Sequence, residues 1–92
     1  MPDAVEQDHH GKPSFRVGGK IFATLWSPNE MNVMASEPRI RMAVADDPDV
    51  CSEVMWGRKL AAVRVKLDAA SEALLEDLLG EAWAQRAPKQ QQ

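Results

Sequence analysis

The sequence contains a single cysteine, Cys51, and no apolar stretch of the length needed to cross a membrane. One cysteine excludes an internal disulfide framework and is typical of proteins from a reducing compartment. The longest apolar runs are short pieces such as residues 60–63, far below the roughly 20 residues of a transmembrane helix. Residues 1–11 also lack the basic and then apolar order of a secretory signal. We therefore predict a cytoplasmic protein without membrane association.

Motifs for catalysis and metal binding are absent as well. The run Asp8-His9-His10, with Cys51 as a further ligand, matches no standard zinc spacing, and adjacent histidines rarely point the same way from a structured element. A dyad of Cys51 with a histidine has no supporting signature. Residues 18–20 lack the glycine spacing and the following Ser or Thr of a phosphate loop. These patterns predict a protein that is not an enzyme and holds no metal or cofactor.

What the sequence does contain is a set of short strand patterns. Residues 14–17 and 20–26 alternate polar and apolar side chains on either side of Gly18-Gly19. Two glycines accept the positive φ angles of a type I′ turn without steric cost, so this segment predicts a β-hairpin. Residues 31–35 predict a third strand. A second antiparallel pair is expected at residues 50–56 and 60–67, with its turn at residues 57–59.

Two helices are predicted between and after these strands. Ser36 is a favourable N-cap for a helix that runs to about Ala45, and Pro48 disfavours its continuation. Asp68 is expected to cap a second helix that ends before Pro88. The apolar stripe of this helix is formed by Leu74, Leu75, Leu78, Leu79, Ala82 and Trp83.

The predicted order is three strands, a helix, two strands and a helix. This order indicates an α+β fold in which an antiparallel sheet of two hairpin units carries both helices on one face. A chain of 92 residues has room for one core. We expect residues 1–13 to be a flexible lead-in, residues 14–87 to be the single domain and residues 88–92 to be a disordered tail.

The charges are segregated along the chain, although the formal net charge is only −3. Residues 12–20 and 54–66 carry bases and no acid, whereas residues 68–85 carry acids and no base. If the apolar sides of the strands face the helices, the bases project from the uncovered face and the turns. Lys and Arg side chains bind the phosphates of DNA, so we predict that the protein binds DNA weakly and without strong sequence preference. The predicted binding residues are Arg16, Lys20, Arg58, Lys59, Arg64 and Lys66.

Two other interpretations of this face are open. Exposed strands need polar side chains, so the bases also fit a simple solvated surface. Strand alternation places Phe22 and Trp26 on the side of Lys20, with Trp56 in another strand near a turn. Aromatic residues among cations suit stacking on single strands, and they suit a protein partner equally well. The alternative function is therefore a protein-interaction or structural module that forms a homodimer and has no nucleic-acid role.

Residues 10–23, with the sequence HGKPSFRVGGKIFA, closely resemble the opening of the MmcQ/YjbR family. Residues 63–67, followed by an acidic and leucine-rich helix, also resemble that family. The resemblance spans about residues 2–87. It implies a fold similar to secretion-chaperone-like and frataxin-like domains, and a DNA-binding role described as a double wing.

The sequence departs from the family pattern at two places. Members of the family open with a helix ahead of the segment seen here at residues 2–6, and that helix is missing from this sequence, because the start codon is misassigned, because the chain is truncated or because the helix is absent from the protein. Members also often carry a tryptophan where this chain has Ala62. The second departure makes the exposed side of that strand less aromatic than is usual in the family.

Overall fold

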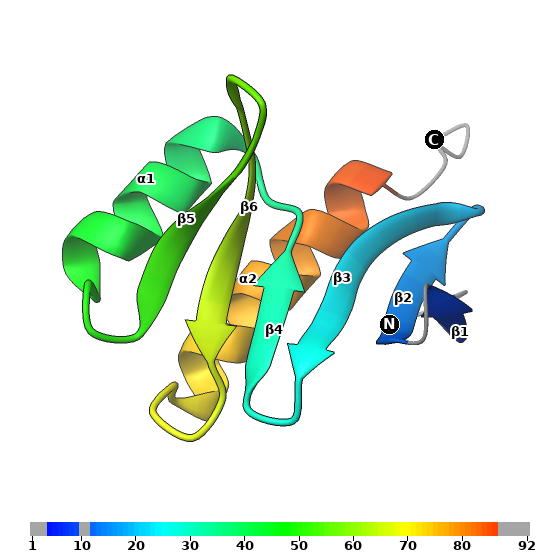
Figure 1. Cartoon of the computed structure of the whole chain (residues 1–92), viewed down its shortest axis with the longest axis horizontal. Coiled ribbons are helices and arrows are strands. Elements are labelled where there is room, and N and C mark those ends of the chain that lie inside the picture. Colours follow the sequence, from blue (N-terminus) through cyan, green and yellow to red (C-terminus); the bar gives the residue numbers. More distant parts are fainter. Residues whose placement is uncertain (1–3, 10–11, 87–92) are drawn as a thin grey trace.

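One antiparallel sheet and two helices make up the part of the chain that the computed structural model describes, which is residues 4–9 and 12–86 (Figure 1). The six strands lie in the spatial order β1-β2-β3-β4-β6-β5. Their bounds are β1 (Ala4–His9), β2 (Lys12–Val17), β3 (Lys20–Ser27), β4 (Glu30–Val33), β5 (Cys51–Trp56) and β6 (Lys59–Lys66).

Helices α1 (Glu37–Asp46) and α2 (Glu72–Arg86) both pack on one face of this sheet (Figure 1). The core lies between them and the strands, and its fully buried members include Val33, Ile40, Val63 and Leu78. The predicted α+β class, with an antiparallel sheet and helices on one face, is confirmed. Within the described residues no helix covers the opposite face, which we call the open face.

Strand β1 corrects the prediction of a flexible lead-in. Residues 4–9 pair with β2 along their whole length, from Ala4 opposite Val17 to His9 opposite Lys12. The backbone donors and acceptors of β1 thus find partners that the local sequence does not reveal. The domain therefore starts earlier than residue 14, and β2 itself starts at Lys12. The predicted tail at residues 88–92 lies outside the described residues.

Helix α1 begins as the sequence predicts. The Ser36 Oγ accepts a hydrogen bond from the Arg39 backbone N–H at 3.3 Å, and Asp47 ends the helix just before Pro48. Helix α2 begins later than predicted, at Glu72, because Ser71 provides its cap. The segment from Asp68 onward first forms a turn, in which the N–H groups of residues 69 and 70 donate to the Lys66 carbonyl. No helix in the described ranges is both long and apolar enough to span a membrane.

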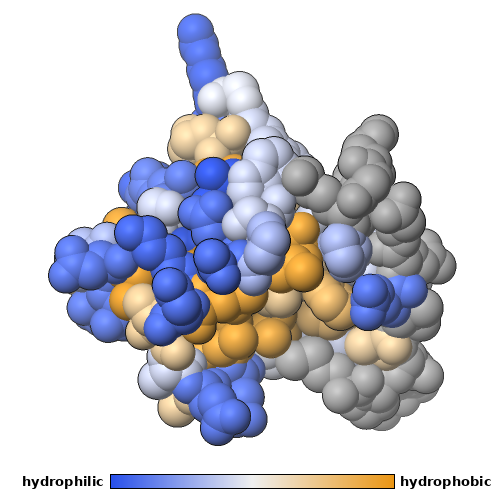
Figure 2. Space-filling model, turned by 60° about the horizontal axis from the view of Figure 1, so that its bottom comes forward, coloured by the Kyte–Doolittle hydropathy of each residue, from blue (hydrophilic) through white to orange (hydrophobic). Residues whose placement is uncertain are grey.

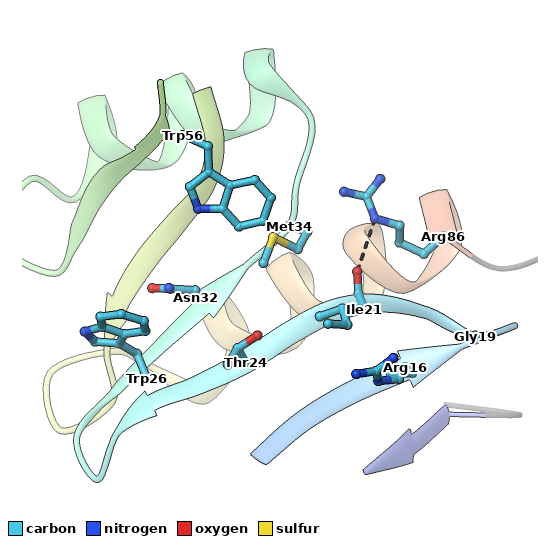
Figure 3. Close-up of a pocket in the computed structure, with 9 residues that line it drawn as sticks. All are labelled: Arg16, Gly19, Ile21, Thr24, Trp26, Asn32, Met34, Trp56 and Arg86. Atoms are coloured by element: carbon cyan, nitrogen blue, oxygen red, sulfur yellow. Dashed lines mark hydrogen bonds between the residues drawn. The ribbon is translucent and has the colours of Figure 1, made fainter. Parts of the chain in front are cut away.

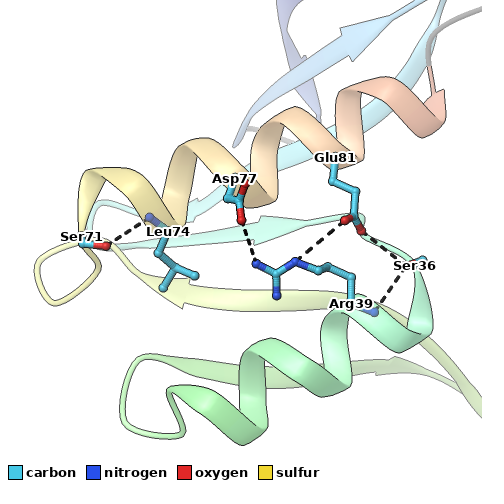
Figure 4. Close-up of polar contacts among 6 residues, drawn as sticks. All are labelled: Ser36, Arg39, Ser71, Leu74, Asp77 and Glu81. Atoms are coloured by element: carbon cyan, nitrogen blue, oxygen red, sulfur yellow. Dashed lines mark hydrogen bonds and ion pairs between the residues drawn. The ribbon is translucent and has the colours of Figure 1, made fainter.

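Polar contacts join the two helices to each other (Figure 4). The Arg39 guanidinium of α1 lies 3.5 Å from the Asp77 carboxylate and 3.8 Å from the Glu81 carboxylate, both on α2. Glu81 also accepts a hydrogen bond from the Ser36 hydroxyl at 3.4 Å. Two of the α2 carboxylates are thus held by α1 on the helix side of the sheet, away from the open face.

The helix side also contains an apolar recess of about 230 Å³ between α2 and strands β1–β4. Viewed from below, hydrophobic residues gather in the middle of the molecular surface among hydrophilic ones (Figure 2). The recess is lined by Ala4, Phe15, Phe22, Met31 and Leu79. Phe22 therefore belongs to the helix side and not to the open face.

Candidate functional site

A bulge in β3 decides which residues of that strand reach the open face. Phe15 lies opposite Ala23 and Arg16 lies opposite Ile21, so Phe22 has no partner in β2. The extra residue interrupts the alternation of the strand. Phe22 and Ala23 both enter the core, at 3% and 0% exposure. The prediction that Phe22 is an exposed interaction residue is therefore wrong.

A row of polar side chains crosses the open face. Cross-strand partners in a sheet point to the same side, and the register aligns one polar residue from each of five neighbouring strands. Ser14, Thr24 and Asn32 in this row are 0%, 6% and 5% exposed, although no described helix covers them. We call this the polar row: Ser14, Thr24, Asn32, Arg64 and Ser52.

A pocket of about 430 Å³ opens on this face (Figure 3). In that view Trp26 and Asn32 lie at one end, and Arg16 and Arg86 lie at the other. The pocket thus has an aromatic end at Trp26 and a cationic end, and in this view Trp56 lies beside Met34 between them (Figure 3). Its lining residues are Arg16, Gly19, Ile21, Thr24, Trp26, Asn32, Met34, Trp56 and Arg86.

Arg64 connects the polar row to the aromatic end of the pocket. Its Nε donates a hydrogen bond to the Asn32 Oδ1 at 3.0 Å. Its guanidinium carbon lies 4.8 Å from the centre of the Trp26 ring, within the range of a cation–π contact. These two contacts fix the guanidinium group and restrain the orientation of the indole ring.

The structure brings four of the six predicted cations to the open face. Arg16 and Arg64 lie beside the pocket. Lys59 lies opposite Trp56, which lines the pocket. Lys66 lies opposite Glu30, and Glu30 is two residues before Asn32 in β4, so both point to the open face. Because cross-strand partners share a side, Lys59 and Lys66 also point to this face.

The other two predicted cations lie elsewhere. Arg58 is exposed at the β5–β6 turn, next to Gly57, whose φ of +62° this tight turn requires. Lys20 lies opposite Val17, a core residue, and therefore points to the helix side at the end of its hairpin. Among the described residues the ion pairs involve Arg39 and Arg41 of α1, and none involves these six cations.

Arg86 is a pocket residue that sequence reasoning missed. It lies in the last turn of α2, where a base is favourable because it faces the negative end of the helix dipole. In the structure its Nε donates to the Ile21 carbonyl of β3 at 3.3 Å, which anchors the side chain beside the pocket (Figure 3). The sequence shows that Arg86 ends an acidic helix, but not that the helix ends at the edge of this pocket.

Cys51 is poorly placed for catalysis or metal binding. It is 2% exposed and lies opposite Val65 in the sheet. Burial raises the pKa of the Cys51 thiol, and the nearby Asp47 carboxylate raises that pKa further. The thiol therefore stays protonated at neutral pH, and the protonated form is a weak nucleophile and ligand. In the described part of the chain, no three His, Cys, Asp or Glu side chains are arranged to hold a metal ion. His10 lies outside that part.

Comparison of the sequence with known protein families matches residues 1–85 to the family model described as YjbR. This match covers most of the chain, including every strand and nearly all of α2. No curated protein and no solved structure gives a match.

Proposed function

The chain belongs to the YjbR family, and on this premise we propose that it binds DNA weakly, without strong sequence preference, through the open face of its sheet. The proposal includes a non-catalytic role and a cytoplasmic location. Its binding residues are the cations of the open face with Arg58 at the adjacent turn. We call the following five residues the open-face cations: Arg16, Lys59, Arg64, Lys66 and Arg86.

The separation of charge between the two sides of the sheet is the observation that supports this proposal. Among the strand residues that the structure describes, the register places the acid Glu30 on the face of these cations, opposite Lys66, while Asp77 and Glu81 are bonded to Arg39 on the helix side. A local positive field can attract DNA even when the net charge is −3. Contacts of Lys and Arg with phosphates release counterions, which makes binding favourable without reading of the bases.

A salt titration tests this proposal. Binding of the full chain to a fluorescein-labelled duplex is measured by anisotropy between about 50 and about 200 mM salt. Each phosphate contact lowers the logarithm of affinity by about 0.9 per unit of log salt, so three contacts give a slope of about −2.7. Absence of binding at the lowest salt concentration would contradict the proposal, and a flat slope would show that phosphate contacts do not drive the association.

Exposed apolar residues favour a second candidate function, a homodimeric interaction module. Trp26 and Trp56 are 42% and 59% exposed, and Met55 is 50% exposed. Strand β5, which carries Trp56 and Met55, is an edge strand whose backbone is open to pairing with another strand. Light scattering should then give twice the monomer mass, and Trp56→Ser should shift the protein to the monomer. A monomeric mass at every concentration would count against this function.

A further inference from the structure

We propose that the pocket on the open face accepts one unpaired nucleotide, with its base toward the tryptophans and its phosphate toward the arginines. The protein would then bind single-stranded DNA in preference to duplex DNA. This inference rests on the proposed function, because it specifies the form of DNA that the same face binds.

The aromatic end of the pocket suits a nucleobase. Trp26 and Trp56 come from strands β3 and β5 and both line the cavity. Bases of any identity stack on indole rings, which gives binding without sequence preference. The contact of Arg64 with the Trp26 ring, together with its hydrogen bond to Asn32, holds this end of the pocket in place before a ligand arrives.

The cationic end of the pocket suits a phosphate. Arg16 of β2 and Arg86 at the end of α2 both line the pocket, and in Figure 3 they lie at the same end of the view, on either side of β3. The Arg86 Nε is bonded to the Ile21 carbonyl, and within the part of the chain that the structure describes the two terminal nitrogens of its guanidinium group remain for a ligand. Paired N–H groups of arginine match the oxygens of a phosphate, and the bond to Ile21 lowers the cost of ordering the side chain.

The floor and the size of the pocket also fit a nucleotide. Thr24 and Asn32 lie at the floor and supply a hydroxyl and an amide that can bond the polar edge of a base. The volume of about 430 Å³ lies within the range of small-molecule sites, which is about 300–1,000 Å³. In a duplex the bases are paired and stacked, and extracting one costs a few kcal/mol. Duplex DNA therefore contacts the rim of the pocket through its phosphates, whereas a single strand can fill it.

The experiment compares a single-stranded dT oligonucleotide with a duplex of equal length, using the full chain and anisotropy at one salt concentration. We expect the single strand to bind at least about 10-fold more tightly. Trp26→Leu and Trp56→Leu should each weaken single-strand binding roughly 10- to 100-fold, with duplex affinity changed by less than about 2-fold. Arg86→Gln should reduce the salt slope for the single strand by about 0.7, the value for one phosphate contact.

Met55→Ala is the matched control for the tryptophan variants. Met55 is an exposed apolar residue of the same strand as Trp56, but it lies opposite Leu60, a core residue, and so points to the other side. Its removal should leave both affinities unchanged, and thermal melting confirms that each variant is folded. Equal affinity for the two forms, or tryptophan variants that bind like the original protein, would overturn this inference and leave the proposed function standing. Failure to bind either form would overturn both.

Discussion

Replacement of Arg16 and Arg64 together by glutamine should weaken duplex binding about 100-fold. It should also reduce the salt slope, which is the slope of log affinity against log salt concentration, by about 1.8. Each arginine is expected to contact one phosphate, and each lost contact lowers the slope by about 0.9. A hydrogen bond to a charged group contributes about 1.5 kcal/mol, so two lost contacts correspond to roughly two powers of ten in affinity. Glutamine retains hydrogen-bonding capacity toward Ser14 and Asn32, the present partners of these arginines.

A second double variant, Lys20→Gln with Arg41→Gln, separates the effect of the face from the effect of net charge. It also removes two positive charges, but from the helix side, because Lys20 lies opposite Val17 and Arg41 is in α1 beside Glu37. We expect its affinity for duplex DNA to fall by less than about 3-fold, with little change in slope. If both double variants lose affinity equally, net charge controls the association, and the open face is not the interface.

Strand β6 also has a bulge, at Ala61, which has no partner in β5. Strand alternation placed Arg64 and Lys66 correctly because this bulge comes before them. In the segment from Val63 onward, every second residue points to the core, as the sequence predicts. The same rule failed for β3, where the extra residue at Phe22 reverses the alternation. A bulge depends on how two strands align along their length. The pattern of β3 alone therefore could not show that Phe22 and Lys20 leave the open face.

The features that the sequence missed all depend on a partner in another element of the fold. Strand β1 is a polar segment with one strongly apolar residue, Val5, and its pairing with β2 is what orders it. Arg86 reaches the pocket through a bond to Ile21, 65 residues earlier in the chain. Local patterns predicted helices, turns and most strands, because caps and glycine turns act over a few residues. They could not predict contacts between elements far apart in sequence.

Phe22→Ala should have the largest effect on stability, lowering the free energy of unfolding by about 3 kcal/mol. Phe22 is 3% exposed and packs in the core, so its removal loses buried apolar surface and leaves a cavity. We expect the lower end of the usual range for phenylalanine, because Phe22 already borders the recess of about 230 Å³. Small domains are stable by only about 5–15 kcal/mol, so this loss is large. Urea unfolding measures it as a lower midpoint with an unchanged m-value.

Trp26→Leu is the matched comparison, since Trp26 is an aromatic residue of the same strand that is 42% exposed on the open face. Its replacement should lower the free energy of unfolding by less than about 1 kcal/mol, as is usual for surface substitutions. The two variants should therefore separate cleanly: Phe22→Ala changes stability, while Trp26→Leu changes binding to single-stranded DNA. If strand alternation were uninterrupted, both residues would be on the open face and both replacements would leave stability nearly unchanged. A Phe22→Ala protein as stable as the original would show that the bulge is misplaced, and the open face would then have to include Phe22 and Lys20.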